Sequence, residues 1–240
     1  MSTNSARRPH AAPSTWVLKT AMAVTGSVFV LFVLIHLFGN LKVYTGPEHF
    51  DSYAHWLRHA FEPFLPAGFV LWCLRIVLVV CLVVHVGAAG ILWARARRAR
   101  GRFRARRVAS RTGLRGLSAA LMPVTGVALL VFIVVHLLDL TIGATPVASA
   151  EFTAATSGTS YAYENLVASF SRPWMAALYV LVMLLLAVHV AHGTSVLASD
   201  FGALGHRLRA TVTVLGAAVA IAILVGNASI PIAVLLGWVS

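Results

Sequence analysis

The sequence predicts an all-α integral membrane protein with five transmembrane helices, and two observations support this fold class. Hydrophobic residues make up 59% of the 240 residues and charged residues only 11%, which is too apolar for an ordinary soluble domain. Charged residues are also absent from four long runs, and a fifth run contains only Arg75. Each run is long enough to cross about 30 Å of hydrocarbon at a rise of about 1.5 Å per residue. The charge-free runs cover residues 20–41, 116–138, 173–199 and 210–240, and the fifth run covers residues 63–94.

The predicted membrane helices lie within a single membrane domain, 1–240, and cover residues 17–38, 66–94, 118–140, 172–198 and 208–236. We expect the first of them to be a retained span. It is too long for a cleaved signal peptide and lacks a small-residue cleavage site. It ends at Gly39-Asn40, which is a common signal for the end of a helix.

The two long connections on the outer side have different patterns. Phe50, Tyr53, Leu57 and Phe61 recur at helical spacing after the first span, which predicts an amphipathic helix on the outer interface. The other connection, 141–173, is a long loop whose second part is patterned, and such a loop more often covers a site than hangs free.

Positive charge is distributed unevenly, and this predicts the topology. The net charge is +12, and ten arginines lie in the connection 95–115. By the positive-inside rule, the N-terminus and this Arg-rich loop are cytoplasmic and the C-terminus is outside. Contact with anionic lipid headgroups explains the charge run without a nucleic-acid partner, and an acidic cytoplasmic protein partner is also compatible.

Four of the predicted spans carry histidines, and two of these spans share a pattern. Thr25-Gly26 precedes His36-Leu37 with the spacing by which Thr125-Gly126 precedes His136-Leu137. An imidazole in hydrocarbon costs free energy unless something binds it, so these residues form a candidate functional site. The four candidates are His36, His85, His136 and His189.

Depth along the helices groups these histidines into two pairs. His36 and His136 lie about 26 Å from the cytoplasmic end at about 1.5 Å per residue, and we call them the outer pair. His85 and His189 lie about 15 Å deep by the same rise, and we call them the inner pair. The pairs are therefore separated by about 11 Å along the membrane normal.

Two opposed imidazoles at one depth are what a bis-histidine b-type haem requires, and the arrangement occurs twice. The prediction is that the first four helices bundle around two stacked, non-covalent haems b (protohaem IX). Gly26 and Gly126 fall at the depth of the inner pair, where a residue without a side chain lets a flat porphyrin approach the backbone. The alternative for these glycines is an ordinary helix–helix contact. A haem-free transporter whose histidines relay protons is the alternative for the whole constellation.

Zinc is the rival ligand at His189-Val-Ala-His192, but no glutamate stands beside the pair as in a metalloprotease motif. His192 is a candidate to bond a haem propionate, a backbone carbonyl or a quinone. Arg75, expected near the midplane, is a candidate counter-ion for haem propionates. Cys73 and Cys81 form no Cys-x-x-Cys motif, which argues against covalent haem attachment and a zinc ribbon, and we expect them in the core.

Several motifs together resemble the di-haem cytochrome b subunit of succinate dehydrogenase/fumarate reductase, the single-chain five-helix type. The motifs are His36-Leu-Phe-Gly-Asn-Leu41, Phe50-Asp-Ser-Tyr-Ala54, Tyr163-Glu-Asn-Leu-Val-Ala-Ser-Phe170, Pro173-Trp174 and His189-Val-Ala-His-Gly193. The chain departs from the family pattern after the fourth span, where it reads Ser199-Asp-Phe-Gly-Ala-Leu-Gly205.

The resemblance implies a subunit of bacterial respiratory complex II in the cytoplasmic (inner) membrane. Its partners would be a flavoprotein and an iron–sulfur subunit on the cytoplasmic side, which interconvert succinate and fumarate. This chain would carry no dicarboxylate site. It would pass electrons from the iron–sulfur subunit through the inner and then the outer haem to a quinone, most simply menaquinone. A cytochrome b anchor of a hydrogenase or formate dehydrogenase is the alternative within the same chemistry.

Glu62 is the candidate for quinone proton exchange, because the resemblance favours a quinone site on the outer side. Asn40, Lys42 and Tyr44 lie near it in the sequence. The alternative is that Glu62 is an interfacial carboxylate of the surface helix.

Overall fold

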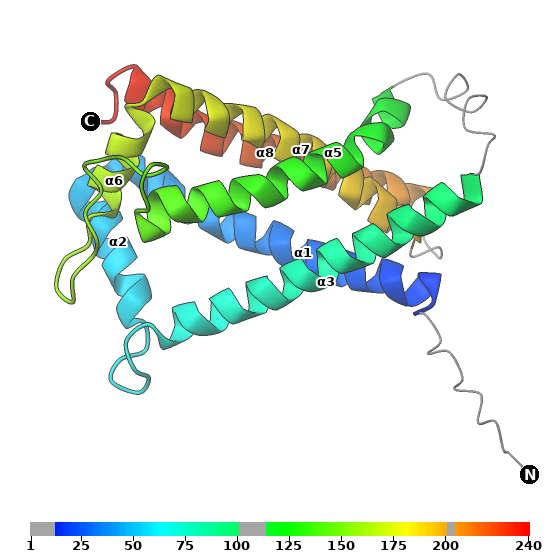
Figure 1. The fold of residues 1–240 in the computed structure, drawn as a ribbon, viewed down its shortest axis with the longest axis horizontal. Helices are drawn as coiled ribbons and strands as arrows, with labels where there is room; N and C mark the ends of the chain where they lie inside the picture. Colours follow the sequence, from blue (N-terminus) through cyan, green and yellow to red (C-terminus); the bar gives the residue numbers. More distant parts are fainter. Residues whose placement is uncertain (1–12, 101–113, 201–204) are drawn as a thin grey trace, which may run out of the picture.

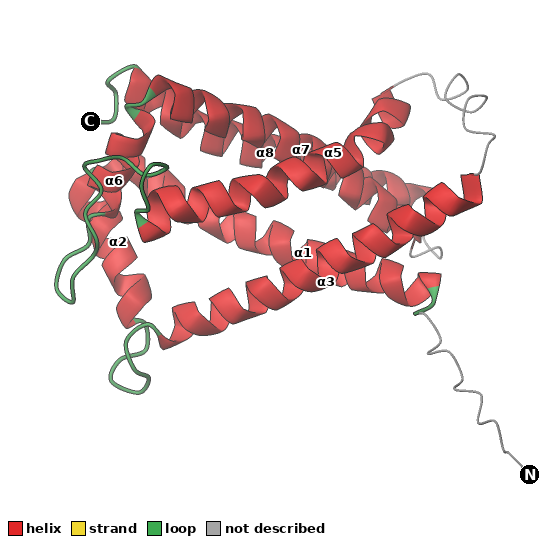
Figure 2. Ribbon diagram, viewed as in Figure 1, coloured by secondary structure: helices red, strands yellow, loops and turns green. Residues whose placement is uncertain are grey.

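The computed structural model describes residues 13–100, 114–200 and 205–240. The described residues form helices joined by turns and loops, with no strand among them (Figures 1 and 2). Five helices in these ranges are long and apolar enough to span a membrane, which confirms the predicted fold class. They are α1 (Thr15–Asn40), α3 (Phe69–Arg100), α5 (Leu114–His136), α7 (Pro173–Asp200) and α8 (His206–Leu235).

Four shorter elements lie at one end of these helices. The 3₁₀-helix η1 (Leu41–Thr45) continues α1, and the π-helix η3 (Leu137–Ile142) continues α5. The helices α2 (Pro47–His59) and α6 (Ala162–Phe170) lie across this end, at the left of Figure 1. We call it the α2–α6 end. The first described residues of α1 lie at the opposite end of the molecule.

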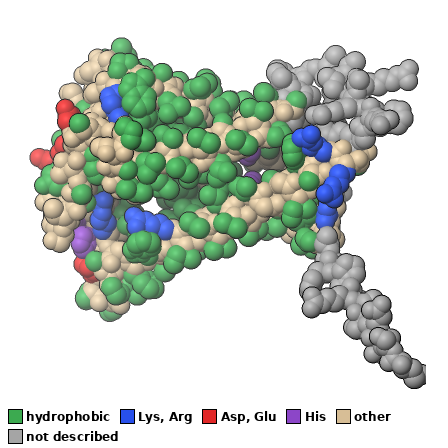
Figure 3. Space-filling view, in the orientation of Figure 1, with side chains coloured by type: hydrophobic (Ala, Val, Ile, Leu, Met, Phe, Trp, Pro, Cys, Tyr) green, Lys and Arg blue, Asp and Glu red, His purple; other side chains and the backbone are tan. Residues whose placement is uncertain are grey.

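The long helices form two groups with a hollow between them. Helix α1 packs on α3, whereas α5 packs on α7 and α7 packs on α8. Smaller contacts of α1 with α7 and α8 join the two groups. The space-filling view shows the hollow between the groups, with histidine side chains (purple) visible inside it (Figure 3). Apolar side chains cover the outside of the helices, as expected of surfaces that face lipid.

Helix α3 packs mainly on α1 and leaves many of its side chains exposed, and this corrects one expectation. Cys73 is exposed and Cys81 is half-buried, so the prediction that both thiols lie in the core is wrong. Hydropathy alone could not distinguish the two positions, because a lipid-facing residue and a core residue are equally apolar.

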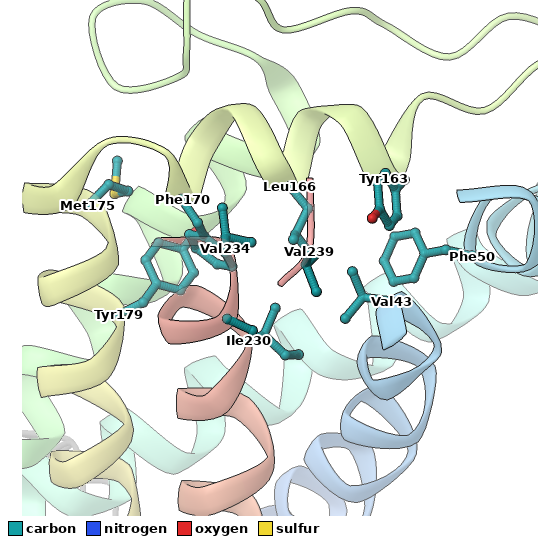
Figure 4. Close-up of a cluster of buried hydrophobic side chains, with 11 residues drawn as sticks. Val43, Phe50, Tyr163, Leu166, Phe170, Met175, Tyr179, Ile230, Val234 and Val239 are labelled. Atoms are coloured by element: carbon teal, nitrogen blue, oxygen red, sulfur yellow. The ribbon is translucent and has the colours of Figure 1, made fainter. Parts of the chain in front are cut away.

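A hydrophobic cluster at the α2–α6 end forms the main described core. It joins side chains from η1, α2, α6, α7 and α8, among them Val43, Phe50, Tyr163 and Tyr179 (Figure 4). The predicted helix after the first span is present as α2, but Phe50 packs against Tyr163 at 6.2 Å between ring centroids. The neighbouring Asp51 carboxylate accepts hydrogen bonds from the first amides of α6, Ala162 N at 2.7 Å and Tyr163 N at 3.2 Å. Helix α2 therefore packs on protein and caps α6.

Close backbone approach and a set of interhelical hydrogen bonds, which we call the polar seam, attach α8 to the other helices. A Cβ added at Gly216 would lie 2.1 Å from Thr194 Oγ1 on α7, so α7 and α8 pack closely there. Asn40 Nδ2 donates to Asn227 Oδ1 at 3.0 Å, and Tyr44 OH donates to Ser229 Oγ at 2.8 Å. These hydrogen bonds join the end of α1 and η1 to α8.

Candidate functional site

The four span histidines come from four different helices. His36 lies on α1, His85 on α3, His136 at the end of α5 and His189 on α7. None of their side chains is fully buried by the protein. Their imidazoles are therefore accessible to a bound group.

The outer pair has the spacing of two imidazoles that share one metal ion. The ring centroids of His36 and His136 are 6.0 Å apart and the ring planes are 84° apart. Imidazole–metal bonds of about 2 Å place the coordinating nitrogens about 4 Å apart and the ring centroids about 6 Å apart. Phe32 stacks on His36 at 5.5 Å, and Phe132 lies beside His136 at 5.7 Å. The separation of His36 and His136 therefore suits two imidazoles that bind one metal ion, and an aromatic ring lies beside each of them.

Each imidazole of the inner pair is bound by a threonine of a neighbouring helix. Thr25 Oγ1 lies 2.9 Å from His85 Nδ1, and Thr125 Oγ1 lies 3.0 Å from His189 Nδ1. Each hydroxyl also lies within donating distance of the carbonyl four residues earlier, 2.7 Å for Thr25 and 3.1 Å for Thr125. We therefore assign the hydroxyl proton to the carbonyl bond and the Nδ1 proton to the imidazole. This tautomer leaves Nε2 with a lone pair for a metal.

The two imidazoles of the inner pair have matching surroundings in the two helix groups. His85 lies on α3, which packs on α1, and His189 lies on α7, which packs on α5 and α8. Each of the two histidines that the depth calculation paired is held by a threonine of its own helix group.

Gly26 and Gly126 lie beside the inner pair. A Cβ added at Gly26 would lie 3.5 Å from His85 Cε1, and one added at Gly126 would lie 3.7 Å from His189 Cε1. Within 4 Å each added Cβ would meet only atoms of that imidazole. At Gly216, by contrast, it would clash with the next helix. Contact between two helices therefore does not require either glycine, whereas a flat group beside the imidazole would occupy the space of a side chain.

The internal repeat extends to the hydrogen bonds. Thr25, Phe32 and His36 recur one hundred residues later as Thr125, Phe132 and His136. Each threonine binds a histidine of the next membrane helix in the chain. Sequence reasoning treated the threonines only as part of the repeat, and their role as histidine partners was missed. Their recurrence eleven residues before a histidine was the available signal.

A second chain of hydrogen bonds leads away from His136. Its Nδ1 lies 3.2 Å from Tyr179 OH, which donates to Asp139 Oδ2 at 3.0 Å. Arg172 Nη2 pairs with Asp139 Oδ1 at 2.6 Å, and Ser169 Oγ donates to Asp139 Oδ2 at 2.6 Å. Asp139 lies three residues after His136 in the sequence. The structure links the two residues through Tyr179, which sequence reasoning did not identify.

Two other candidate residues lie on α3 and α7. Arg75 lies six residues after the start of α3, with its guanidinium 5.0 Å from the centre of the Trp72 ring. It is therefore nearer the α2–α6 end than the midplane position predicted for it. His192 is half-buried and lies one turn beyond His189.

The candidate quinone residues lie at the α2–α6 end. Glu62 is exposed in the turn between α2 and α3. Asn40 and Tyr44 hydrogen-bond to α8 as described above, and the Lys42 ammonium lies 5.1 Å from the centre of the Tyr53 ring.

Comparison with known proteins identifies the family. The family model described as "Succinate dehydrogenase/Fumarate reductase transmembrane subunit" matches residues 98–226, which is just over half of the chain. The matched range includes His136 and His189, and the repeat relates this half to the half that carries His36 and His85. No curated protein and no solved structure matches the chain. With five membrane-spanning helices and this match, the chain belongs to the family of succinate dehydrogenase/fumarate reductase transmembrane subunits.

Proposed function

We propose that this chain is the di-haem anchor of its complex, which passes electrons between an iron–sulfur subunit and a quinone, most simply menaquinone. One observation carries the proposal: the imidazoles of His36 and His136 lie with their ring centroids 6.0 Å apart, which is the spacing of two ligands on one metal ion. In three of the four span imidazoles Nδ1 is bound by a hydroxyl, which leaves Nε2 as the ligand.

The proposed roles follow from the positions of the side chains. His36 and His136 would hold the outer haem, and His85 and His189 the inner haem. When bound, the haems would supply one-electron carriers between the iron–sulfur subunit and the quinone. The threonine hydroxyls orient the inner imidazoles, while Gly26 and Gly126 leave the space beside them open.

The two ends of the bundle suit different partners. The end that carries the start of α1 is the proposed cytoplasmic face, where the flavoprotein and iron–sulfur subunits would dock. Arg95 at this end donates to Pro13 O at 2.6 Å and to Thr15 Oγ1 at 3.2 Å, which ties α3 to the start of α1. Glu62, exposed at the α2–α6 end, stays the candidate for proton exchange with quinone.

The family match separates this proposal from the other candidates. An anchor of a hydrogenase or formate dehydrogenase would share the haem chemistry, but the matched family is that of succinate dehydrogenase/fumarate reductase. A haem-free proton transporter would need histidines in a relay, whereas His36 and His136 face each other as a pair.

The test is a reduced-minus-oxidised optical spectrum of the purified complex, with pyridine haemochrome quantitation. We expect two b-type haems per chain, and one in either His36→Ala or His85→Ala. His49→Ala is the matched control, because His49 is an exposed histidine of α2, and it should keep both haems.

Two results would contradict the proposal. One is the absence of haem from correctly assembled complex. The other is retention of two haems in both the His36→Ala and the His85→Ala variants, which would remove these imidazoles from the ligand set.

A further inference from the structure

A buried carboxylate lies close to the outer pair. The Asp139 side chain has no exposed surface, although it lies in the third apolar span. An ionised carboxylate at such a position is costly unless other groups bind it. Arg172, Ser169 and Tyr179 supply those bonds. Asp139 also lies within the π-helical turn η3, a type of distortion that frequently occurs at functional sites.

The Tyr179 hydroxyl links this carboxylate to a candidate iron ligand. It has a single proton, and Asp139 Oδ2 is an acceptor 3.0 Å away. The hydroxyl therefore accepts from the Nδ1–H of His136, at 3.2 Å. Phe132 and Phe170 pack edge-on against the Tyr179 ring, with centroids 5.0 Å and 4.8 Å away, and hold it in place (Figure 4 shows Phe170 beside it).

His136 differs in this respect from the inner pair. His85 and His189 bond to threonine hydroxyls, which in turn bond to backbone carbonyls. The bonds of His136 lead instead to a carboxylate. Because Arg172 lies 2.6 Å from that carboxylate, the two charges largely offset each other at a distance. The hydrogen-bond chain is then the route by which Asp139 acts on the imidazole.

We infer that Asp139, acting through Tyr179, makes His136 a stronger electron donor and so lowers the reduction potential at the outer pair. A carboxylate linked to the far nitrogen of a ligating imidazole raises the basicity of that ligand. A more basic ligand stabilises oxidised iron relative to reduced iron. Tyr179 and Asp139 are positioning residues in this scheme, which rests on the proposed role of His136 as an iron ligand.

The test is a spectroscopic redox titration of the complex in a His85→Ala background, where only the outer pair can hold haem. Tyr179→Phe keeps the packed ring and removes the hydroxyl. We expect one haem per chain to be retained and the reduction equilibrium to shift about tenfold toward the reduced form, which is 59 mV for one electron. Tyr163→Phe is the matched control, because its hydroxyl donates to Ser240 O at 3.3 Å, and it should leave the potential unchanged.

A double-mutant cycle separates the hydrogen-bond chain from a simple charge effect. We expect Asp139→Asn to raise the potential when Tyr179 is present, and to have less than half of that effect in the Tyr179→Phe background. Equal effects in both backgrounds would show that Asp139 acts only as a distant charge, and would overturn the inference. An unchanged potential in Tyr179→Phe with haem retained would also overturn it. Absence of haem from the unsubstituted complex would instead contradict the proposed function.

Discussion

Two threonine hydroxyls orient the inner pair. Thr25 and Thr125 are buried, and each bonds both to its own helix and to an imidazole of the next membrane helix. The hydroxyl holds the ring in one orientation and leaves Nε2 available. Loss of such a partner typically weakens metal binding by about 10–100-fold.

The first prediction is that Thr125→Val weakens haem binding at the inner pair by at least about tenfold. Valine keeps the shape of threonine but cannot accept from His189 Nδ1. The measurement is the haem retained per chain after exchange against an excess of a haem-binding protein. Thr211→Val is the matched control, because the Thr211 hydroxyl bonds to Arg207 O at an exposed position. Equal haem loss in the two variants would contradict the role of Thr125.

The second prediction concerns the space beside His189. A leucine at Gly126 would extend its side chain past His189 Cε1, which lies 3.7 Å from the position of an added Cβ. We expect Gly126→Leu to reduce the haem content from two to one without preventing insertion of the chain. Gly90→Leu, at a position where an added Cβ meets nothing within 4 Å, should keep two haems. If Gly126→Leu retains two haems, the space beside His189 is not needed for a cofactor and Gly126 is an ordinary helix residue.

At the scale of elements, α8 is attached mainly to α7. The close contact at Gly216 and the polar seam of Asn40 with Asn227 attach it to the histidine-bearing helices, but α8 supplies no histidine to either pair. In a membrane, helix association depends on close packing and interhelical hydrogen bonds, because lipid and side chains are equally apolar. Small residues at the α7–α8 contact should therefore matter more than small residues elsewhere.

The third prediction compares two Gly→Ala substitutions. Gly216→Ala places a Cβ 2.1 Å from Thr194 Oγ1 and should destabilise the protein by about 1–3 kcal/mol, as overpacking typically does. Gly87→Ala, where an added Cβ meets nothing within 4 Å, should stabilise the protein by up to about 1 kcal/mol through helix propensity. Thermal unfolding in detergent measures both. A lower Tm for Gly87→Ala than for Gly216→Ala would contradict this account of the contact.

The apolar helices could be predicted from the sequence because charges interrupt them so rarely, and the depth of each histidine followed from the helical rise. The hydrogen-bond partners of those histidines could not be predicted, because a hydrogen bond between helices depends on how each helix is rotated and on which neighbour it contacts. Hydropathy determines neither the rotation of a helix nor the neighbour that it contacts.

Tyr179 lies ten residues before His189 on the same helix, which places it near the depth of the outer pair. That spacing was an available signal. The π-helical turn that holds Asp139 had no comparable signal.

At the scale of the whole molecule, the two ends of the bundle are distinct. The start of α8 and the start of α1 lie at one end, whereas the loop before α6 and the last residues of the chain lie at the other (Figure 1). Among the described residues, Arg95, Arg97 and Arg98 lie near the first end, which is why we propose it as the cytoplasmic face.

The fourth prediction tests this topology in a cysteine-free background. We expect a membrane-impermeant thiol reagent, added from outside, to label Ser157→Cys in intact cells. Gly205→Cys, exposed at the start of α8, should be labelled only after the membrane is opened. The reverse pattern would invert the proposed orientation and move the docking face of the partner subunits to the other end.

The repeat described above also has an evolutionary consequence. Duplication and fusion of one ancestral two-helix hairpin would account for the matched threonines and histidines of the two halves. The proposed ligands of the outer haem come from both hairpins, because His36 of one half faces His136 of the other. On the proposed function, the ancestral hairpin would have held its cofactors only as a homodimer, which fusion would make permanent in one chain. After fusion the two copies were free to diverge, and the Tyr179–Asp139 chain beside a single histidine is the kind of asymmetry that a symmetric ancestor could not carry.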